Sequence, residues 1–243
     1  MKRMLERLGL RKRRPDDLVQ LVPEIDPAAA ALIRAVAPYT MSGPERIWSL
    51  ISSVRHVVRA GIPGEVIECG VWRGGNLIVA AEVLRALGER RVIRGYDTFA
   101  GMSEPTVEDV SFTGGVAASR WSQTVKDDHS EWSYSPIEEV SANVARFVPD
   151  TDVRLIKGKC EETLKVEENL PETVAVLRLD TDWYESTLVE LEVLWPRLSP
   201  GGILIVDDYG HWGGSRKAVD EYFAGRPVFL SRVDYTARLV IKS

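Results

Sequence analysis

Two adjacent carboxylates, Asp207 and Asp208, follow directly on the apolar run at 202–206. A third carboxylate, Asp180, closes another apolar run, VAVLRLD at 174–180. Both runs indicate buried strands of a parallel sheet. Because parallel strands bring their carboxyl ends to one edge of the sheet, where ligands bind, the three carboxylates should converge there. Like charges gathered in this way repel one another and need a positive partner.

The sequence allows two kinds of positive partner for these carboxylates. An oxygen-only, carboxylate-rich set selects a hard divalent cation such as Mg²⁺, with Mn²⁺ or Ca²⁺ as alternatives, and no cluster of Cys and His argues for zinc. In the other interpretation, one Asp caps the following helix and another pairs with Arg178 or Arg216. We expect the metal, held by three ligands: Asp180, Asp207 and Asp208.

Two earlier strand-like runs also end in candidate binding residues. The first, GEVIECGV, continues into WRGG, so Gly70 and the glycines at 74 and 75 let the backbone approach a ligand. Glu68 stands where a GxGxxG motif has its first glycine, which favours a cofactor with a cationic amino-acid end over a pyrophosphate. The second ends in YDTF, where Asp97 is placed to accept hydrogen bonds from ribose hydroxyls. A packing turn and a helix cap are the plainer interpretations of these two motifs.

The elements that position these residues alternate from residue 64 onward, which predicts an α/β fold with a mostly parallel sheet covered by helices on both faces. Expected strands span 64–71, 92–99, 153–160, 174–180 and 202–206, with helices at 76–87, 137–147, 186–198 and 215–225. Two further strands, 227–234 and 237–243, are joined so closely that they must be antiparallel. This order is that of a class I methyltransferase Rossmann-like fold, with a seven-stranded sheet ending in an antiparallel hairpin.

We expect a single domain in which residues 1–63 form an N-terminal helical cover and residues 64–243 form the methyltransferase unit. In the cover, Ser42 should cap a helix that begins at 43 or 44, with Glu45 completing a capping box. The basic arm at 1–14 indicates a solvated or oligomer-contacting helix. A polar insert at 101–136 is too long for an ordinary connection and is expected to act as a lid.

Composition narrows the choice of partners. With 44% hydrophobic and 28% charged residues and a formal charge of −5, the chain is typical of soluble globular proteins and carries no general attraction to nucleic acid. No run approaches the ~20 apolar residues of a membrane span, and no signal-peptide core follows the basic start. Cys69 and Cys160 indicate free buried thiols of a reducing compartment. We expect a cytoplasmic homo-oligomer.

Four motifs, ECGVWRGG, YDTFAGM, LRLDTDWYEST and SPGGILIVDDYGHWGGSRKAVDEYF, occur in order between about Tyr39 and Arg238. Together they resemble the macrocin O-methyltransferase (TylF-type) family. The resemblance implies S-adenosylmethionine as methyl donor, Mg²⁺ as required metal, and a hydroxyl of a deoxysugar or sugar-bearing secondary metabolite as acceptor. It carries the family's metal ligands onto the same three aspartates. It maps the cofactor pocket onto Met41, Ser42, Glu68, Gly70, Arg73, Asp97, Thr98, Phe99 and Asp180.

The general base stays open between His129 in the insert and Asp182, the second acid of the LDTD motif. His211 is a third candidate or a substrate contact, and His56 is expected to pack on an apolar helix face. Four aromatic residues are expected either to form the lid and sugar platform or to pack in the core: Trp132, Tyr134, Trp183 and Trp212.

Two other enzyme classes remain as alternatives. A catechol or phenol O-methyltransferase would share the metal but take an aromatic acceptor. A nicotinamide oxidoreductase is disfavoured because the GxGxxG motif is missing.

Overall fold

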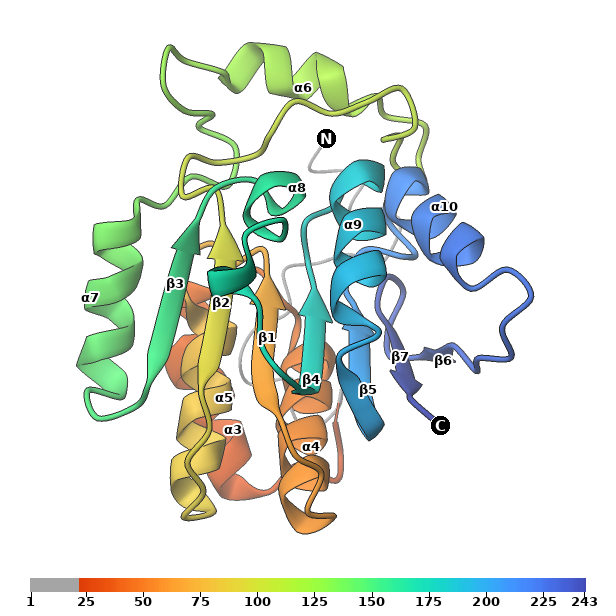
Figure 1. Ribbon diagram of the computed structural model, residues 1–243. Helices are drawn as coiled ribbons and strands as arrows, with labels where there is room; N and C mark the ends of the chain where they lie inside the picture. The colour runs from red at the N-terminus through yellow and green to blue at the C-terminus, as the bar shows by residue number, and fades with distance from the viewer. Residues whose placement is uncertain (1–21) are drawn as a thin grey trace.

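The computed structural model describes residues 22–243, so the basic arm lies outside the described residues. Its seven-stranded sheet has the order β3-β2-β1-β4-β5-β7-β6 (Figure 1). The first five strands are parallel, β7 is antiparallel to β5, and β6 is antiparallel to β7. The strands are β1 (Glu65–Cys69), β2 (Ile93–Asp97), β3 (Val153–Lys157), β4 (Val174–Leu179), β5 (Leu198–Val206), β6 (Ser231–Arg232) and β7 (Arg238–Ile241). The expected fold class and the antiparallel ending are confirmed.

Helices cover both faces of this sheet. The apolar cores place α3 (Pro27–Val36), α4 (Pro44–Arg59), α5 (Gly75–Ala86) and α7 (Ile137–Phe147) on one face. The other face carries α8 (Cys160–Thr163), α9 (Tyr184–Leu194) and α10 (Gly213–Tyr222). Two 3₁₀ turns, η2 (Ala37–Tyr39) and η3 (Glu167–Asn169), and α6 (Ala117–Thr124) complete the elements. Between residues 22 and 243, no helix has both the length and the apolar character that crossing a bilayer requires.

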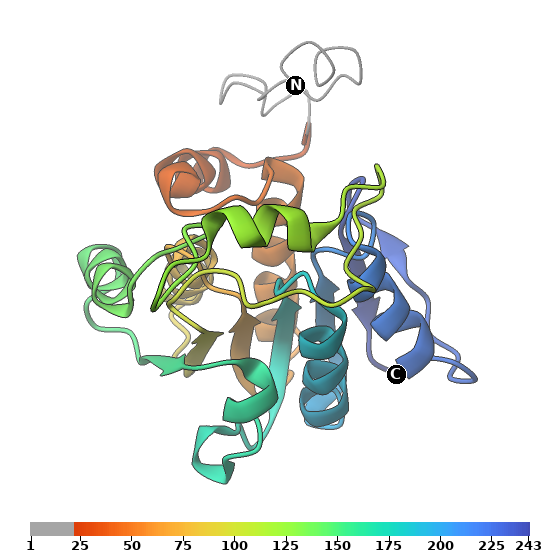
Figure 2. The same cartoon turned by 90° about the horizontal axis from the view of Figure 1, so that it is seen from above.

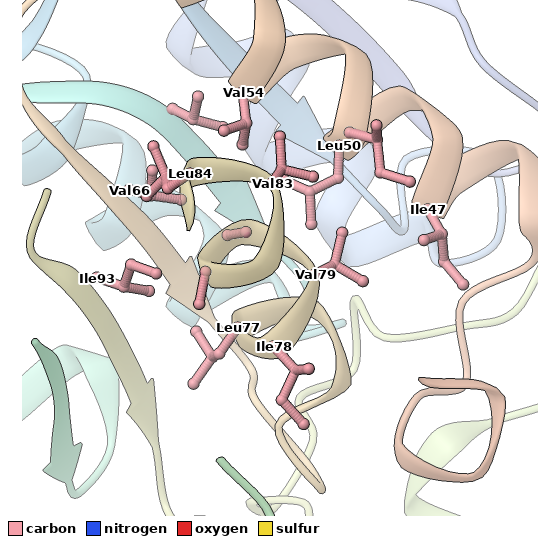
Figure 3. Packing of buried hydrophobic residues seen from close by; sticks show 14 of the residues in the cluster. Ile47, Leu50, Val54, Val66, Leu77, Ile78, Val79, Val83, Leu84 and Ile93 are labelled. Atoms are coloured by element: carbon pink, nitrogen blue, oxygen red, sulfur yellow. The ribbon is translucent and has the colours of Figure 1, made fainter. Parts of the chain in front are cut away.

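The core on the first face forms around α5, which packs against both the sheet and α4. Figure 3 shows Leu77 and Leu84 of α5 beside Val66 and Ile93 of the sheet, with Leu50 of α4 on the far side. A helix enclosed in this way must be apolar nearly all round, as NLIVAAEVL is. Its first turn is thereby held against the carboxyl end of β1, where the candidate site lies.

Two expected boundaries moved for reasons of backbone chemistry. Helix α9 ends at Leu194 and not at residue 198, because Pro196 cannot continue the helix. Strand β5 begins at Leu198 rather than at 202. Its pairing with β4 shifts register between Val174 and Val176, so that Pro200 falls in an irregular stretch where its missing N–H does no harm.

The cap expected at the start of α4 is wrong. Pro44 is the first helical residue, so Gly43 is the N-cap, and glycine has no side chain with which to cap the helix. The Ser42 hydroxyl instead accepts hydrogen bonds from Asn76 at 3.2 Å and Arg178 at 2.8 Å. The Ser42 hydroxyl therefore bonds to side chains of β4 and α5 and not to the first turn of α4.

The insert at 101–136 contains α6 and lies over the carboxyl ends of the strands (Figures 1 and 2). It is anchored by Asp109, which is fully buried and accepts hydrogen bonds from the Tyr184 backbone N–H at 2.9 Å and from Thr106. Asp109 therefore satisfies an N–H in the first turn of α9 from outside the helix. A Cβ on Gly214 would lie 1.9 Å from Asp109 Oδ1, so only glycine fits there.

Candidate functional site

A cavity of about 330 Å³ lies at the carboxyl edge of the sheet, beneath the insert. Nine of the residues expected from the sequence line it: Met41, Ser42, Gly70, Asp97, Thr98, Asp180, Asp182, Asp207 and Asp208. Four others lie outside its lining: Glu68, Arg73, Phe99 and His129. Residues at or just after the ends of β1, β2, β4 and β5 therefore line the cavity, as expected for a parallel sheet.

The acidic trio of Asp180, Asp207 and Asp208 converges as expected. Each offers a carboxylate oxygen within 4.8 Å of the others. Asp208 is 8% exposed, and its Oδ2 is buried without a hydrogen-bond partner among the described residues. Burial, followed by the negative charges of Asp182 and Asp207, raises the pKa of Asp208 well above its usual value. The trio thus includes one buried carboxylate oxygen that receives no hydrogen bond from the described residues.

Arg178 of β4 connects two members of this trio to Glu68 of the neighbouring strand β1. Its Nη1 donates to Glu68 Oε1 at 2.6 Å and to Asp180 Oδ2 at 2.7 Å, and its Nη2 donates to Asp207 Oδ1 at 2.5 Å. Glu68 and Arg178 are register partners on the parallel strands β1 and β4, so their side chains leave the same face of the sheet side by side.

Arg46 of α4 supplies a second guanidinium. It contacts Asp207 Oδ2 through Nη1 and lies 3.3 Å from Asp234 Oδ2 through Nε. Burial acts to raise the pKa of Asp207, but the charges of Arg178 and Arg46 outweigh it and hold that pKa below its usual value. Asp207 is therefore the firmly ionised member of the trio.

These pairs correct the idea that only a bound ion lets the trio coexist. Arg178 pairs with two of its members, as the alternative interpretation allowed, whereas the Arg216 guanidinium binds the carbonyls of Tyr209 and Gly210. Helix α10 has Trp212 as its N-cap, and no side chain in the described part of the chain caps it. The arginines share the neutralisation without completing it. Arg178 and Arg46 pair with Glu68, Asp180, Asp207 and Asp234, whereas no ion pair of the described residues reaches Asp182 or Asp208.

The residues present fit a hard divalent cation. The donors are oxygen atoms only, they lie within 4.8 Å of one another, and one of them is buried without a partner. The remaining negative charge is the electrostatic condition that a divalent cation satisfies. Both oxygens of Asp207 already meet arginines, so a cation there would share that carboxylate with Arg46 and Arg178.

Glu68 has a different place from the one expected. It is 3% exposed, and its Oε1 accepts from Arg178 and from Asn76 Nδ2 at 3.0 Å. Burial raises its pKa to about 7. Glu68 lies behind the cavity wall and positions Arg178, while its Oε2 has no partner among residues 22–243.

Asp97 lines the cavity and also organises the loop that follows β1. Its Oδ2 accepts the backbone N–H groups of Val71 at 2.7 Å and Trp72 at 2.9 Å, and its Oδ1 accepts that of Phe99 at 2.7 Å. Trp72 and Phe99 both have positive φ, of 49°, which such bonds help to hold. Carboxylate oxygens keep further lone pairs, so Asp97 can still accept from a ligand hydroxyl.

Gly70 lines the cavity and Arg73 does not. Gly70 has φ 85°, and a Cβ there would lie 2.0 Å from the carbonyl oxygen of Asp180, so glycine alone permits this approach of β1 to β4. Arg73 points away from the cavity: it pairs with Glu139 of α7 at 2.6 Å and donates to the Pro38 carbonyl at 3.0 Å. Its neighbours make Arg73 a link between α7 and the chain before α4.

Of the two candidate bases, the cavity contains Asp182. Asp182 has φ 69°, and burial raises its pKa to about 7, with the negative charges of Asp180 and Asp207 acting in the same direction. His129 lies outside the lining, with Nδ1 2.7 Å from Asp128 Oδ1 and its ring 4.4 Å from that of Tyr134.

The other two histidines are placed as follows. His211 lines the cavity with Nδ1 3.3 Å from the Tyr235 hydroxyl, and burial lowers its pKa. The expectation for His56 is wrong. It is exposed, because the apolar face of α4 is formed by Ile47, Leu50, Ile51, Val54 and Val57.

Three tryptophans form one cluster, in which two line the cavity and the third packs against them. Trp183 lies 5.5 Å from Trp132 and 5.0 Å from Trp212 between ring centres. Trp132 and Trp212 line the cavity, and Trp183 packs against them and donates to the Ser103 carbonyl. The Arg120 guanidinium lies 4.0 Å from the centre of the Trp132 ring. Tyr134 is outside the lining and accompanies His129.

Several wall residues were absent from the sequence expectations: Arg46, Arg120, Gly158, Lys159, Glu161, Tyr235 and Thr236. The segment at 158–161 follows β3, so the strand-end rule could have found it. Arg46 and Arg120 come from helices whose approach to the site depends on tertiary packing, and no local pattern marks them.

Comparison with known proteins gives consistent matches. The sequence model of macrocin-O-methyltransferase (TylF) matches residues 29–239. The 8-demethyl-8-(2,3-dimethoxy-alpha-L-rhamnosyl)-tetracenomycin-C 4'-O-methyltransferase of Streptomyces olivaceus is 37% identical over 202 residues, covering 82% of this chain and 73% of that protein. The mycinamicin III 3''-O-methyltransferase of Micromonospora griseorubida is 35% identical over 186 residues, covering 76% and 70%.

Solved structures agree with the fold. The O-methyltransferase NovP is 32% identical with a TM-score of 0.70, covering 84% of this chain and 82% of that one. The SAH-bound Podospora anserina methyltransferase PaMTH1 shares the fold at 15% identity, with a TM-score of 0.58 and coverage of 99% and 96%. These likenesses are to O-methyltransferases or to methyltransferases, and they give no support to a nicotinamide oxidoreductase.

Proposed function

This chain belongs to the macrocin-O-methyltransferase (TylF) family and is an O-methyltransferase, and we propose that it methylates a hydroxyl of a deoxysugar carried by a secondary metabolite. The proposal includes S-adenosylmethionine as donor and Mg²⁺ as the metal. The observation that carries it is the cavity itself, in which an acidic trio with one unpartnered oxygen faces a glycine-lined strand end. The rhamnosyl group in the name of one relative's substrate supports the acceptor class.

The donor would lie along the ends of β1 and β2. Asp97 would accept hydrogen bonds from its ribose hydroxyls, and Gly70 leaves room for its close approach to the backbone. Ser42 would face its amino-acid end, and the segment at 158–161 would border its base. When bound, S-adenosylmethionine supplies a sulfonium methyl group that a nucleophilic oxygen can attack in line, with S-adenosylhomocysteine as the leaving group.

Asp180, Asp207 and Asp208 would hold the cation. When bound, Mg²⁺ acts as a Lewis acid that makes a nearby hydroxyl more acidic. Asp182 lies in the same wall and would receive the hydroxyl proton on its carboxylate. Arg178 and Arg46 hold Asp207 in place and limit the repulsion within the trio.

The aromatic wall would receive the sugar. Trp132 and Trp212 present ring surfaces that can cover the apolar face of a pyranose, and Asp109 keeps the insert closed over the strand ends. A closed, dry cavity favours methyl transfer from a sulfonium to an oxygen nucleophile, because opposite charges are neutralised in the transition state.

An acceptor panel tests this proposal. Purified chain with S-adenosylmethionine and Mg²⁺ is offered rhamnosyl glycosides, free deoxysugars, nucleotide-linked deoxysugars and catechol, and products are followed by mass spectrometry. We expect one added methyl group on a sugar-bearing acceptor, loss of turnover in EDTA, and its return with excess Mg²⁺. Methylation of catechol alone would contradict the acceptor class, and full turnover in EDTA would contradict the metal.

A further inference from the structure

Three side chains to which the proposed reaction gives no chemical role converge on the second face of the sheet. Cys69 ends β1, Cys160 begins α8, and Glu190 lies within α9. Each offers a ligand atom, Sγ or carboxylate oxygen, and these atoms lie within 4.8 Å of one another. Cys69 and Glu190 are 0% exposed and Cys160 is 4% exposed. This group is called the thiol cluster below.

Glu190 is the unusual member of the thiol cluster. Its neighbours on the buried side of α9 are Leu191 and Leu194, so an apolar residue would satisfy packing at this position. A buried carboxylate is costly unless it is paired. The Thr181 hydroxyl donates to its oxygens at 3.0 and 3.2 Å, and the Cys69 and Cys160 thiols adjoin the same carboxylate. No cation of the described residues pairs with it, so the anionic form lacks a counter-charge.

The donor set identifies the cation that would supply this charge. Two thiolates and a carboxylate suit Zn²⁺, a borderline-soft ion that takes four ligands in a tetrahedron. The Thr181 hydroxyl, already in contact with Glu190, is placed to be a fourth, neutral oxygen. We propose that Cys69, Cys160 and Glu190 form a Zn²⁺ site distinct from the acidic trio. The trio differs in offering oxygen alone.

The distances are compatible with such a site after a small closure. Zn–S bonds of about 2.3 Å and Zn–O bonds of about 2.0–2.2 Å place tetrahedral ligand atoms roughly 3.5–4 Å apart. The cluster atoms, all within 4.8 Å, would need to close by about 1.3 Å at most. Helix α8 is a single turn of four residues after β3, so it can shift without disturbing the sheet.

Binding is balanced by proton release. Burial raises the pKa of the Cys69 thiol to about 12 and that of Glu190 to about 8, so the cluster is protonated near neutral pH when no cation is bound. Zn²⁺ would accept electron pairs from both sulfurs and from the carboxylate, and their protons would pass to buffer. Cys160 lines the cavity, which gives the ion and the protons a route.

A cation bound to the thiol cluster would also affect the cavity wall. Thr181 stands between Asp180 and Asp182 in the wall and is held by Glu190. A cation that takes Glu190 as ligand changes this contact, so Zn²⁺ should slow methyl transfer even when Mg²⁺ is saturating. This consequence rests on the proposed function, whereas the site itself does not.

Cobalt spectroscopy tests the site without turnover. The full chain, freed of metal by chelator, is titrated with Co²⁺ in excess Mg²⁺, which occupies hard oxygen sites. We expect a thiolate-to-cobalt charge-transfer band at one Co²⁺ per chain, removed by one equivalent of Zn²⁺. Absence of this band in the wild-type chain overturns the proposal.

Variants assign the band to its ligands. Cys160→Ser should abolish it, Glu190→Gln should weaken Co²⁺ binding at least ~10-fold, and Asp208→Asn should retain it. A band that persists in Cys160→Ser, or one that depends on Asp208, would place the metal elsewhere and overturn the assignment. If a cysteine variant does not fold, the wild-type chain still decides, because Zn²⁺ must raise its melting temperature in excess Mg²⁺.

Discussion

Arg178 and Asp207 form a buried ion pair in the wall of the cavity, with Nη2 2.5 Å from Oδ1 and side-chain exposures of 2% and 1%. The same guanidinium also binds Glu68 and Asp180. A single side chain from β4 therefore holds acids from three adjacent strand ends, and removing it leaves several buried carboxylates without a partner.

Arg178→Gln should strongly destabilise the chain. Breaking a buried pair by removal of one partner costs about 3–5 kcal/mol, because the remaining charge stays buried. The stability of Arg178→Lys should fall between those of Arg178→Gln and the wild type, since an ammonium keeps the charge but cannot reproduce the forked contacts of a guanidinium. Urea denaturation measures both. Arg154→Gln is the matched control, because its pair with Asp152 is about half exposed on both sides and its loss should change little.

Asp182→Asn should lower the rate of methyl transfer by about 10²- to 10⁴-fold, the usual contribution of a general base. Its position in the cavity wall beside Asp208 is the reason. His129→Ala should stay near the wild-type rate, because this histidine lies with Tyr134 outside the lining. Rates of both variants over a range of pH decide the matter. A large loss in His129→Ala with a mild effect in Asp182→Asn would transfer the role to the histidine.

Gly70→Ala should impair both folding and donor binding. The new methyl would lie 2.0 Å from the Asp180 carbonyl oxygen, which cannot yield without moving a proposed metal ligand. Gly88→Ala is a matched control with a similar positive φ of 68° and nothing in the described structure within 4 Å of the added Cβ. It should cost only the backbone strain, about 1–2 kcal/mol. Thermal unfolding and calorimetry with S-adenosylmethionine separate the two, and equal effects would show that the close approach is unimportant.

Glu190→Gln should change how stability depends on pH. Burial raises the native-state pKa of Glu190 to about 8 from a usual value near 4.5. Between these values the native chain keeps a proton that the unfolded chain has lost, so this group's stabilisation is complete below about 4.5 and disappears as pH rises through 8. The variant should lack this loss and gain in melting temperature relative to the wild type at alkaline pH. Both proteins are measured in EDTA. If their melting temperatures changed with pH in parallel, the raised pKa would not belong to Glu190.

The fold could be predicted because its signal is periodic and local. Buried strands such as VAVLRLD and the short link between the last two strands fix the class without knowledge of tertiary contacts. The acidic trio could also be predicted, since strand ends share an edge. Arg46 could not, because it reaches Asp207 from a helix distant in sequence.

The misplaced residues show where local patterns are ambiguous. Ser42-Gly43-Pro44 offers two possible caps, and proline at the first helical position decides for Gly43. Glu68 was expected at the cavity because it stands where a GxGxxG motif has its first glycine, and Phe99 because the family resemblance implies it. Glu68 is instead bound by Arg178 and Asn76, and Phe99 packs in the apolar core, and both contacts depend on tertiary packing.

The central claim is that Asp180, Asp207 and Asp208 bind a hard divalent cation. Mn²⁺ titration of the chelator-treated chain, followed by electron paramagnetic resonance of the free ion with Zn²⁺ present to occupy thiol ligands, measures this directly. We predict one bound Mn²⁺ per chain, displaced by Mg²⁺ and lost in Asp208→Asn, with the fold of that variant verified by circular dichroism. Failure of the wild-type chain to bind Mn²⁺, or undiminished binding by Asp208→Asn, would contradict the account.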